Sequence, residues 1–372
     1  MPATANLATA IVIGLGNIGS HLVPHVARMP GIGRVVLIDP DVYGDANRSS
    51  QAVGEGDIGR AKAVVQAEVV RRVNPDLAVT RLPHAVEDVP LGCLRGDLIL
   101  ACLDSRATRQ YVNEAARSLG VPWIDAGVEP GSWLARVNVY EPGAEAPCLE
   151  CAWDQRDYDA LPQRYPCRSG ASAGATAAPS SLGALAASLQ ALECQKLLTG
   201  QGTAAMGAEV LVDAGAHTLF RTEMRRHPAC RLTHSEPFEI TRVESNVGEM
   251  TLEETFVLGG DHGSDPDVVW LHVPMHAWAG QLTCGRCGHV VKGPRLHRAG
   301  GGASSPCPAC GGVLAVSGFD LLEELGSHLM PASELSRTLE DLGLRDRDVV
   351  GIGRSGERRY VELGGWAEGE QR

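Results

Sequence analysis

A glycine-rich turn that directly follows a short apolar strand constrains the fold of this chain most. Three apolar residues precede Gly14, and Gly16, Asn17 and Gly19 complete the turn. Asp39, which ends the next apolar run, lies 20 positions after the last glycine. The first glycine permits a tight turn, the second lets the backbone approach a phosphate, and the third allows close packing of helix on strand. The pattern predicts a nucleotide site at a helix N-terminus, with the acid accepting hydrogen bonds from ribose hydroxyls.

Composition narrows the classes of partner. The chain has 372 residues, a net charge of −12 and only 4% aromatic residues, which argues against nucleic acid and anionic lipid as partners. No apolar run approaches the ~18 residues of a membrane span, and no signal peptide is visible, so we expect a cytoplasmic protein. Eleven cysteines in such a chain favour metal ligands and reactive thiols over disulfides.

The hydrophobic pattern predicts an α/β fold. Strand-like and helix-like segments alternate up to about residue 141, and a stretch rich in Pro, Gly, Ala and Ser follows at 142–181. Near-continuous apolar strands indicate a Rossmann-like, mostly parallel sheet with helices on both faces and ligands at the carboxyl ends of the strands. The expected strands are 11–13, 35–38, 77–82, 97–103, 123–128, 133–140, 208–213 and 218–224, and the expected helices are 61–73, 106–119 and 182–198.

Residues suited to phosphate chemistry follow the second strand and the strand at 97–103. They are Asp41, Asn47, Arg48, Gln51, Lys62 and Asp104. With the glycine turn they form a combined pattern that resembles the ThiF/MoeB/ubiquitin-activating enzyme family over about residues 8–236. Members of that family use ATP to adenylate the C-terminal glycine carboxylate of a ubiquitin-like or sulfur-carrier protein.

The resemblance implies a role for each of these side chains. Lys62 would contact the phosphates and Asp104 would hold Mg²⁺, while Asn47 and Gln51 would position phosphates or ribose. Structural alternatives remain open: Lys62 could be solvated at its helix start, Asp104 could cap the helix that begins near residue 106, and Asp41 could be a loop acid.

One position departs from the family pattern. Where the family has an arginine three residues after the asparagine, this chain has Ser50, and its arginine stands at Arg48. Two alternatives remain open: Arg48 could reach the phosphates from a rearranged loop, or the neutralising charge could come from elsewhere.

The resemblance also implies a structural zinc site. The family joins a two-residue-spaced cysteine pair to a second pair near the end of the domain, and here a histidine replaces the last cysteine. The expected ligands are Cys148, Cys151, Cys230 and His234. Three sulfurs and one imidazole suit tetrahedral zinc.

A second cysteine set is recognised by spacing alone. Two pairs with two-residue spacing are separated by 19 residues, a spacing typical of a zinc ribbon, and a glycine follows each pair. The expected ligands are Cys284, Cys287, Cys307 and Cys310. The basic residues between the pairs are interpreted as solvated surface rather than a nucleic-acid face.

The resemblance further points to a reactive thiol and a domain plan. Cys167, flanked by two arginines that favour the thiolate, matches the cysteine that takes the acyl group or takes part in sulfur transfer. We expect a homodimer built from an adenylation domain at 1–236, a strand-rich segment with the ribbon at 237–320, and a small α/β element at 321–372.

Two other functions remain open, as does a narrower variant of the first in which a peptide or small carboxylate is activated rather than a protein. An NAD-dependent oxidoreductase would use the glycine turn and its acid but would leave Asn47, Gln51, Lys62 and Asp104 without a role. A nucleotide-binding adaptor with a degenerate site is favoured by the departure at Ser50. Pyrophosphate release from ATP would separate the proposed enzyme from both.

Overall fold

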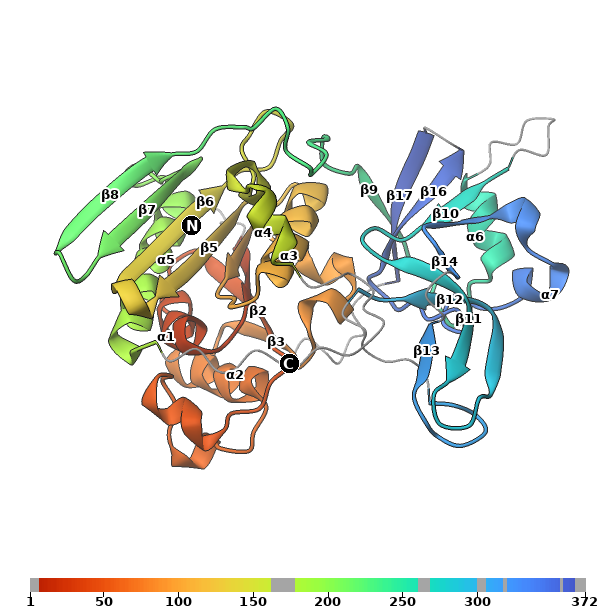
Figure 1. Ribbon diagram of the computed structural model, residues 1–372, viewed down its shortest axis with the longest axis horizontal. Coiled ribbons are helices and arrows are strands. Elements are labelled where there is room, and N and C mark those ends of the chain that lie inside the picture. The colour runs from red at the N-terminus through yellow and green to blue at the C-terminus, as the bar shows by residue number, and fades with distance from the viewer. Residues whose placement is uncertain are drawn as a thin grey trace, which may run out of the picture.

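The computed structural model describes residues 7–161, 178–259, 268–299, 306–316, 320–354 and 357–364 (Figure 1). An N-terminal unit on the left of the view and a C-terminal unit on the right lie next to one another. Among the described residues, every helix is too short or too polar to cross a bilayer.

The N-terminal unit is built on one eight-stranded sheet with the order β3-β2-β1-β4-β5-β6-β7-β8. The first five strands pair in parallel, and β6, β7 and β8 are added antiparallel. The predicted mostly parallel α/β fold is therefore confirmed. Strands β2 and β4 flank β1 on opposite sides, so the carboxyl end of β1 is the switch point at which such sheets bind ligands. The strands are β1 Ala8–Ile13, β2 Ile32–Ile38, β3 Ala78–Leu82, β4 Leu98–Ala101, β5 Trp123–Glu129, β6 Leu134–Tyr140, β7 Ala208–Asp213 and β8 Thr218–Glu223.

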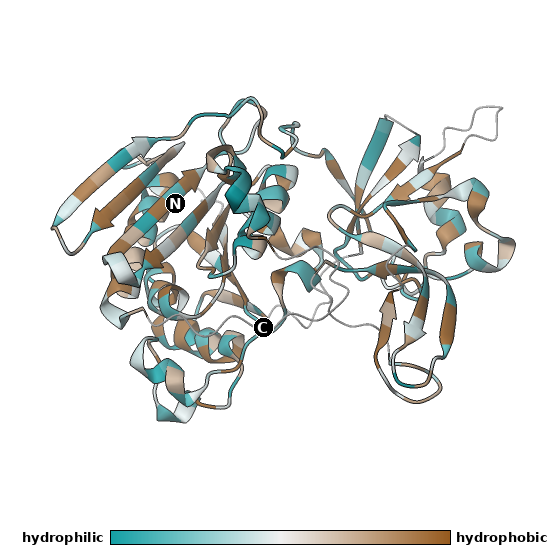
Figure 2. Ribbon diagram, viewed as in Figure 1, coloured by the Kyte–Doolittle hydropathy of each residue, from teal (hydrophilic) through white to brown (hydrophobic). Residues whose placement is uncertain are grey.

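Helices cover both faces of this sheet, as the apolar strands require. One hydrophobic cluster joins Val12 of β1 to helices α1, α2 and α5, and a second cluster joins Ile13 of β1 to α3. Successive side chains of a strand point to opposite faces, so β1 contributes to both cores. Figure 2 colours much of these strands as hydrophobic, in line with their burial. The helices are α1 Asn17–Val26, α2 Lys62–Val73, α3 Arg106–Leu119, α4 Gln155–Asp159 and α5 Ser180–Thr199.

The C-terminal unit contains a five-stranded mixed sheet with the order β15-β10-β16-β17-β9. Its inner face forms a third hydrophobic cluster, to which helix α6 contributes Leu252 and Phe256. Strand β9 pairs in parallel with β17, although more than a hundred residues separate them. The elements are β9 Ile240–Val243, α6 Leu252–Gly259, β10 Trp270–His272, β15 Glu324–Gly326, α7 Ala332–Leu335, β16 Val349–Arg354 and β17 Glu357–Leu363.

A small antiparallel sheet carries the second cysteine set. Strand β11 (Ala277–Cys284) pairs with β12 (Val290–His297), β13 (Leu314–Val316) and the two-residue strand β14 (Leu321–Leu322). The five-stranded sheet draws its strands from both sides of the predicted boundary at residue 320. We therefore propose that 237–364 is one unit, into which this ribbon is inserted.

The two units meet at a polar junction. Gly92 N donates to Arg347 O at 2.8 Å. The fully buried Glu362 carboxylate forms ion pairs with Arg347, whose Nε lies 2.7 Å from Glu362 Oε1, and with Arg95. A β-carbon at position 92 would lie 2.4 Å from Arg347 O, so only glycine fits this contact. The junction is thus a close backbone contact locked by a buried carboxylate.

Candidate nucleotide and metal sites

The glycine turn lies against the loop that follows β4. Gly14 has φ +86°, and a β-carbon there would lie 2.5 Å from Cys102 O. A β-carbon at Gly19 would lie 2.0 Å from Gly14 O, so this position also has no room for a side chain. At Gly16 the nearest atom to a β-carbon would be Gln51 Nε2 at 3.9 Å, which leaves this part of the turn open. The first and third glycines therefore serve packing, and the second lies where a ligand could approach.

Asp39, at the carboxyl end of β2, stabilises the glycine turn through hydrogen bonds to the main chain. Its carboxylate accepts hydrogen bonds from Leu15 N at 2.6 Å and Asp41 N at 2.8 Å. Burial raises the pKa of the Asp39 carboxyl, while the charge of Lys62 and the two backbone donors act in the opposite direction. The acid is therefore part of the turn's support, and its contact with a ribose stays a prediction.

Lys62 begins α2 and is largely buried between two carboxylates. Its Nζ lies 2.8 Å from Asp41 Oδ2 and 3.9 Å from Asp39 Oδ1. Tyr43, which sequence reasoning missed, lies beneath it: its hydroxyl donates to Leu15 O at 2.8 Å, and Gln66 Nε2 donates to that hydroxyl at 2.9 Å. A single tyrosine in a polar loop has no sequence pattern that would predict a role in supporting the site.

The loop between β2 and α2 places its polar residues differently. Asn47 Oδ1 accepts from Gly44 N at 2.8 Å and so stabilises a short helical turn, Asp45–Ser49. Arg48 is exposed and pairs with Asp45 at 3.1 Å. Gln51 has a buried Oε1 with no hydrogen-bond donor in the described structure, near the open side of the glycine turn. Gln51 therefore has an acceptor to offer a ligand, whereas Arg48 would first have to leave its partner.

Asp104 is exposed in the loop after β4. Ser105, not Asp104, caps α3, because its Oγ accepts from Thr108 N at 3.3 Å. The alternative in which Asp104 serves only as a helix cap is thus excluded. Its role as a Mg²⁺ ligand stays a prediction.

A buried ion-pair network missed by the sequence analysis supports this loop. The fully buried Asp125 of β5 pairs with Arg109 of α3 and Arg136 of β6, each at 2.9 Å. Arg109 also donates to Leu103 O, next to Asp104. An acid in the middle of an apolar strand was the signal that could have revealed Asp125, because a buried carboxylate needs cationic partners.

Asn17 faces helix α5. Its Nδ2 donates to Ala178 O at 3.0 Å, and its Oδ1 lies where Gly183 leaves room for it. The side chain therefore joins α1 to the segment before α5, and a direct contact of Asn17 with a nucleotide stays a prediction. Cys167 lies outside the described residues.

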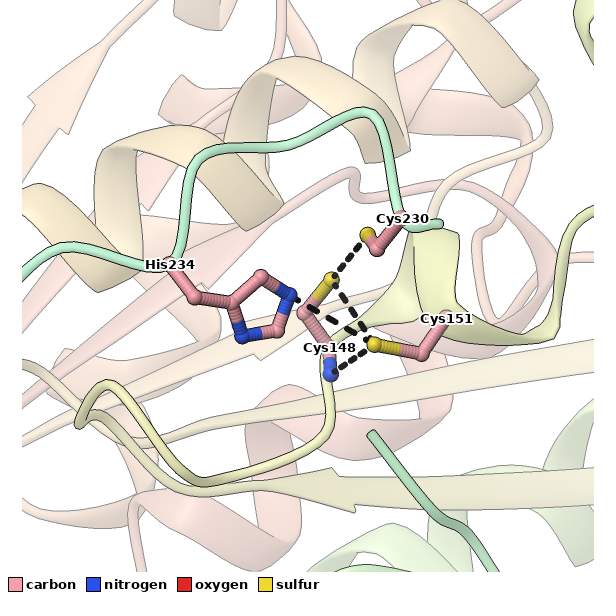
Figure 3. A group of neighbouring side chains, drawn as sticks. All are labelled: Cys148, Cys151, Cys230 and His234. Atoms are coloured by element: carbon pink, nitrogen blue, oxygen red, sulfur yellow. Dashed lines mark hydrogen bonds between the residues drawn. The ribbon is translucent and has the colours of Figure 1, made fainter. Parts of the chain in front are cut away.

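The first predicted metal-ligand set comes together, with all four ligand atoms within 4.8 Å of one another (Figure 3). The Sγ atoms of Cys148 and Cys230 are 3.6 Å apart, and Cys151 Sγ lies 3.5 Å from His234 Nε2. The hydrogen bond from Cys148 lowers the pKa of the Cys151 thiol to about 4. A ready thiolate among two further sulfurs and an imidazole fits a tetrahedral zinc ion, and the metal itself stays a prediction.

The second set, Cys284, Cys287, Cys307 and Cys310, also places its four sulfurs within 4.8 Å. The two cysteine pairs form turns with the same hydrogen bond: Gly288 N donates to Cys284 O at 3.0 Å, and Gly311 N donates to Cys307 O at 2.8 Å. Both glycines have positive φ, 72° and 68°, which explains why glycine follows each pair. Among the basic residues between the pairs, Lys292 is exposed, as expected for solvated surface. For Arg298 that expectation is wrong: it is buried because it pairs with the buried Asp348 at 2.6 Å.

A groove of about 400 Å³ lies beside the first metal cluster, over the antiparallel end of the main sheet. Strands β6, β7 and β8 form its floor, and the segment that carries the first cysteine pair forms a wall. Its lining mixes charged, polar and apolar side chains, which include Arg136, Asn138, Leu149, Trp153, Glu209 and Met224.

Comparisons with known proteins agree with this geometry. The ThiF family model matches residues 5–232. Mouse adenylyltransferase and sulfurtransferase MOCS3 is 31% identical over 241 residues, which is 64% of this chain and 50% of the mouse protein. The sulfur carrier protein ThiS adenylyltransferase of Escherichia coli (strain K12) is 30% identical over 223 residues, 59% of this chain and 83% of that protein.

A solved structure shows the same fold. The crystal structure of E. coli MccB matches with a TM-score of 0.50 and 21% identity, and covers 63% of this chain and 67% of that one. At this identity the likeness concerns the fold alone. Because the family model spans the whole N-terminal sheet with the glycine turn and the three cysteines of the first metal cluster, this chain belongs to the ThiF family.

Proposed function

We propose that this chain uses ATP to adenylate the C-terminal glycine carboxylate of a ubiquitin-like or sulfur-carrier protein. The observation that carries the proposal is the convergence of the glycine turn, the Lys62 ion pairs and the Asp104 loop at the carboxyl ends of β1, β2 and β4. The similarity to the sulfur carrier protein ThiS adenylyltransferase of E. coli supports this class of partner.

The nucleotide binds across the switch point of the sheet. Its phosphates lie along the Gly14–Gly19 turn, where the first N–H groups of α1 and the dipole of that helix favour an anion. Gln51 offers its buried Oε1, and Asp39 accepts from the ribose.

The reaction requires positioning rather than a base. A carboxylate oxygen of the carrier attacks the α-phosphorus of ATP, the bond from that phosphorus to the bridging oxygen breaks, and pyrophosphate leaves with the electron pair. The carboxylate is already ionised at neutral pH, so no proton has to be removed. What the site must supply is alignment and neutralisation of negative charge.

Lys62 and Arg48 supply cations from this chain. Both are paired with carboxylates that are largely exposed, Asp41 and Asp45, and a phosphate can replace an exposed carboxylate as their partner. When bound, Mg²⁺ would be held by Asp104 and would neutralise phosphate oxygens.

The tail of the carrier lies in the groove over β6, β7 and β8. This location is supported by Arg136, which lines the groove and is linked through Asp125 and Arg109 to the main chain beside Asp104. Cys167 then takes the acyl group from the adenylate: its Sγ forms a thioester, and AMP leaves. Zinc at both cysteine clusters is structural, and the active form is a homodimer.

ATP–pyrophosphate exchange with purified carriers tests the first step. We expect exchange with a ubiquitin-like or sulfur-carrier protein that ends in glycine, and none with the same carrier lacking its last glycine. A thiol-labile adduct by mass spectrometry that disappears in Cys167→Ala tests the second step.

Other outcomes point to the alternatives. Nicotinamide reduction without exchange would identify an oxidoreductase, and ATP binding without exchange would identify an adaptor. Exchange with a free peptide carboxylate but with no carrier protein would contradict the proposed substrate class.

A further inference from the structure

Four side chains form a row on the surface between the first metal cluster and the start of α3. The Arg231 guanidinium lies 3.9 Å above the Tyr158 ring, and Tyr158 meets Trp153 edge-on at 5.3 Å. The Arg106 guanidinium lies 5.9 Å from the Trp153 ring. We call Arg231, Tyr158, Trp153 and Arg106 the stacked row.

The two ends of the stacked row have different neighbours. Arg231 lies in the chain between Cys230 and His234, so closing the metal cluster fixes where its guanidinium can reach. Arg106 is the first residue of α3, two positions after Asp104. The row therefore connects a metal-ligand loop to the loop of a predicted Mg²⁺ ligand.

Hydrogen bonds and an ion pair hold the middle of the row in place. Tyr158 donates to Glu150 Oε2 at 3.0 Å, and Gln110 of α3 donates to the same oxygen at 3.1 Å. Glu150 is buried and lies between Cys148 and Cys151 in the chain. Asp157, next to Tyr158, pairs with Arg106 at 3.0 Å. Helix α4 is thus held by both halves of the metal cluster and by α3.

We propose that Arg231 and Arg106 are positioning residues that transmit the geometry of the first metal cluster to the loop of Asp104. Helix α4 has only five residues, and a helix of that length depends on tertiary contacts for its position. Without metal, the Cys230–His234 segment is no longer tied to the first cysteine pair, and Arg231 is no longer fixed over Tyr158. The inference rests on the proposed function only for the role of Asp104.

The first experiment measures the row without any assay of activity. Trp153 fluorescence, isolated as the difference between the wild type and Trp153→Phe, is recorded before and after removal of zinc with a chelator. We expect zinc removal to change this emission in the wild type, and Arg231→Met to resemble the metal-free wild type while still holding zinc.

The second experiment measures the Mg²⁺ dependence of ATP–pyrophosphate exchange. In Arg231→Met and Arg106→Met the half-saturating Mg²⁺ concentration should rise about three- to tenfold, the effect expected from losing one cation–π contact. The double variant should show little more than either single change, because both break the same row.

Arg156→Met is the matched control. Arg156 lies in α4 itself, loses the same charge, and has a side chain that is 90% exposed and pairs with Asp154. Its fluorescence response to zinc removal and its Mg²⁺ dependence should equal those of the wild type.

The outcomes separate this inference from the proposed function. Wild-type Mg²⁺ dependence and wild-type Trp153 response in a zinc-loaded Arg231→Met would overturn the inference. Should Arg231→Met lose zinc, Arg106→Met decides, since it leaves the metal-ligand loop intact. Absence of exchange with every carrier in the wild type would end the proposed function, while the fluorescence result would still decide the inference.

Discussion

The two metal clusters differ in how much of the chain they connect. The first joins residues 148–151 to residues 230–234, and between them the chain forms α4, α5, β7 and β8. The second joins residues 284–287 to 307–310 around the strand β12. Tying together a longer loop restricts the unfolded chain more, although only slowly with length.

The surroundings of the two clusters differ as well. The first lies against the main sheet and, through Glu150 and the stacked row, contacts the helix that follows Asp104. The second has a small hydrophobic cluster of its own and an exposed ligand, Cys287. We infer that the first cluster supports the proposed nucleotide site, whereas the second supports the ribbon and, through Arg298 and Asp348, the C-terminal unit.

The largest expected effect is a loss of ATP–pyrophosphate exchange that occurs for a substitution in the N-terminal unit but not for one in the C-terminal unit. Asp104→Asn removes the carboxylate proposed to hold Mg²⁺ and should lower ATP–pyrophosphate exchange by about a hundred- to thousandfold, the range for loss of one electrostatic group. Asp341→Asn, an exposed acid of the C-terminal unit, is the matched control and should leave exchange unchanged. Equal losses in both variants would contradict the assignment of the chemistry to the first unit.

The next effect compares the clusters directly. Cys148→Ser should cost more than about 3 kcal/mol of unfolding free energy and abolish exchange, because a buried ligand and the metal are lost together. Cys287→Ser should lose one zinc, destabilise the C-terminal unit and keep exchange. Zinc content, thermal unfolding and exchange measure this, and a Cys287→Ser protein without activity would show that the ribbon takes part in catalysis.

A smaller effect concerns the junction between the units. Gly92→Ala forces a β-carbon against Arg347 O and should cost about 2 kcal/mol, as for other forced overpacking. Hydrogen exchange should rise at 86–94 and at 345–348 but not around the metal clusters. Gly56→Ala, where a β-carbon meets open space, is the control.

The smallest effect is a pH dependence confined to the C-terminal unit. Burial, with a contribution from Arg358, lowers the pKa of the His272 imidazole from 6.5 to about 4. Between pH 6.5 and 4 the His272 imidazole is therefore protonated in the unfolded chain but neutral in the folded unit. Its contribution to the free energy of unfolding is complete above pH 6.5 and is lost as pH drops toward 4. We expect a loss of about 1–2 kcal/mol, which His272→Phe should remove. Lower protection factors of the β10 amides at low pH, taken relative to the intrinsic exchange rate at each pH, measure it, and the same acid response in His272→Phe would rule this origin out.

The sequence analysis succeeded where a local pattern determines the structure. Helix α3 ends at Leu119, as expected from the sequence, and Gly120 follows it with a φ of 68°, the left-handed conformation that favours glycine. The cysteine pairs were equally readable, because metal chemistry demands short spacings within each pair. The buried strands at the centre of the main sheet, such as β1 and β2, were apolar enough to be recognised without their partners.

Other features could not be read from the sequence, because they depend on distant partners. The sequence around β9 does not indicate that this strand pairs with β17. In the same way, the sequence around Glu362 does not indicate that its carboxylate will pair with Arg95 and Arg347. The direction of the Asn17 side chain depends on the space that Gly183 leaves in another helix. Periodicity reports which face of an element is buried but not what it is buried against.

The pairing of β9 with β17 gives the C-terminal unit a two-ended attachment. The chain leaves the first unit just before β9 and comes back to it in β17, next to the strand by which it left. The ribbon is thus an insertion into a base, the five-stranded sheet, whose first and last strands lie side by side. A cut in the tip of its hairpin would leave both fragments bound, because Arg298 still pairs with the buried Asp348.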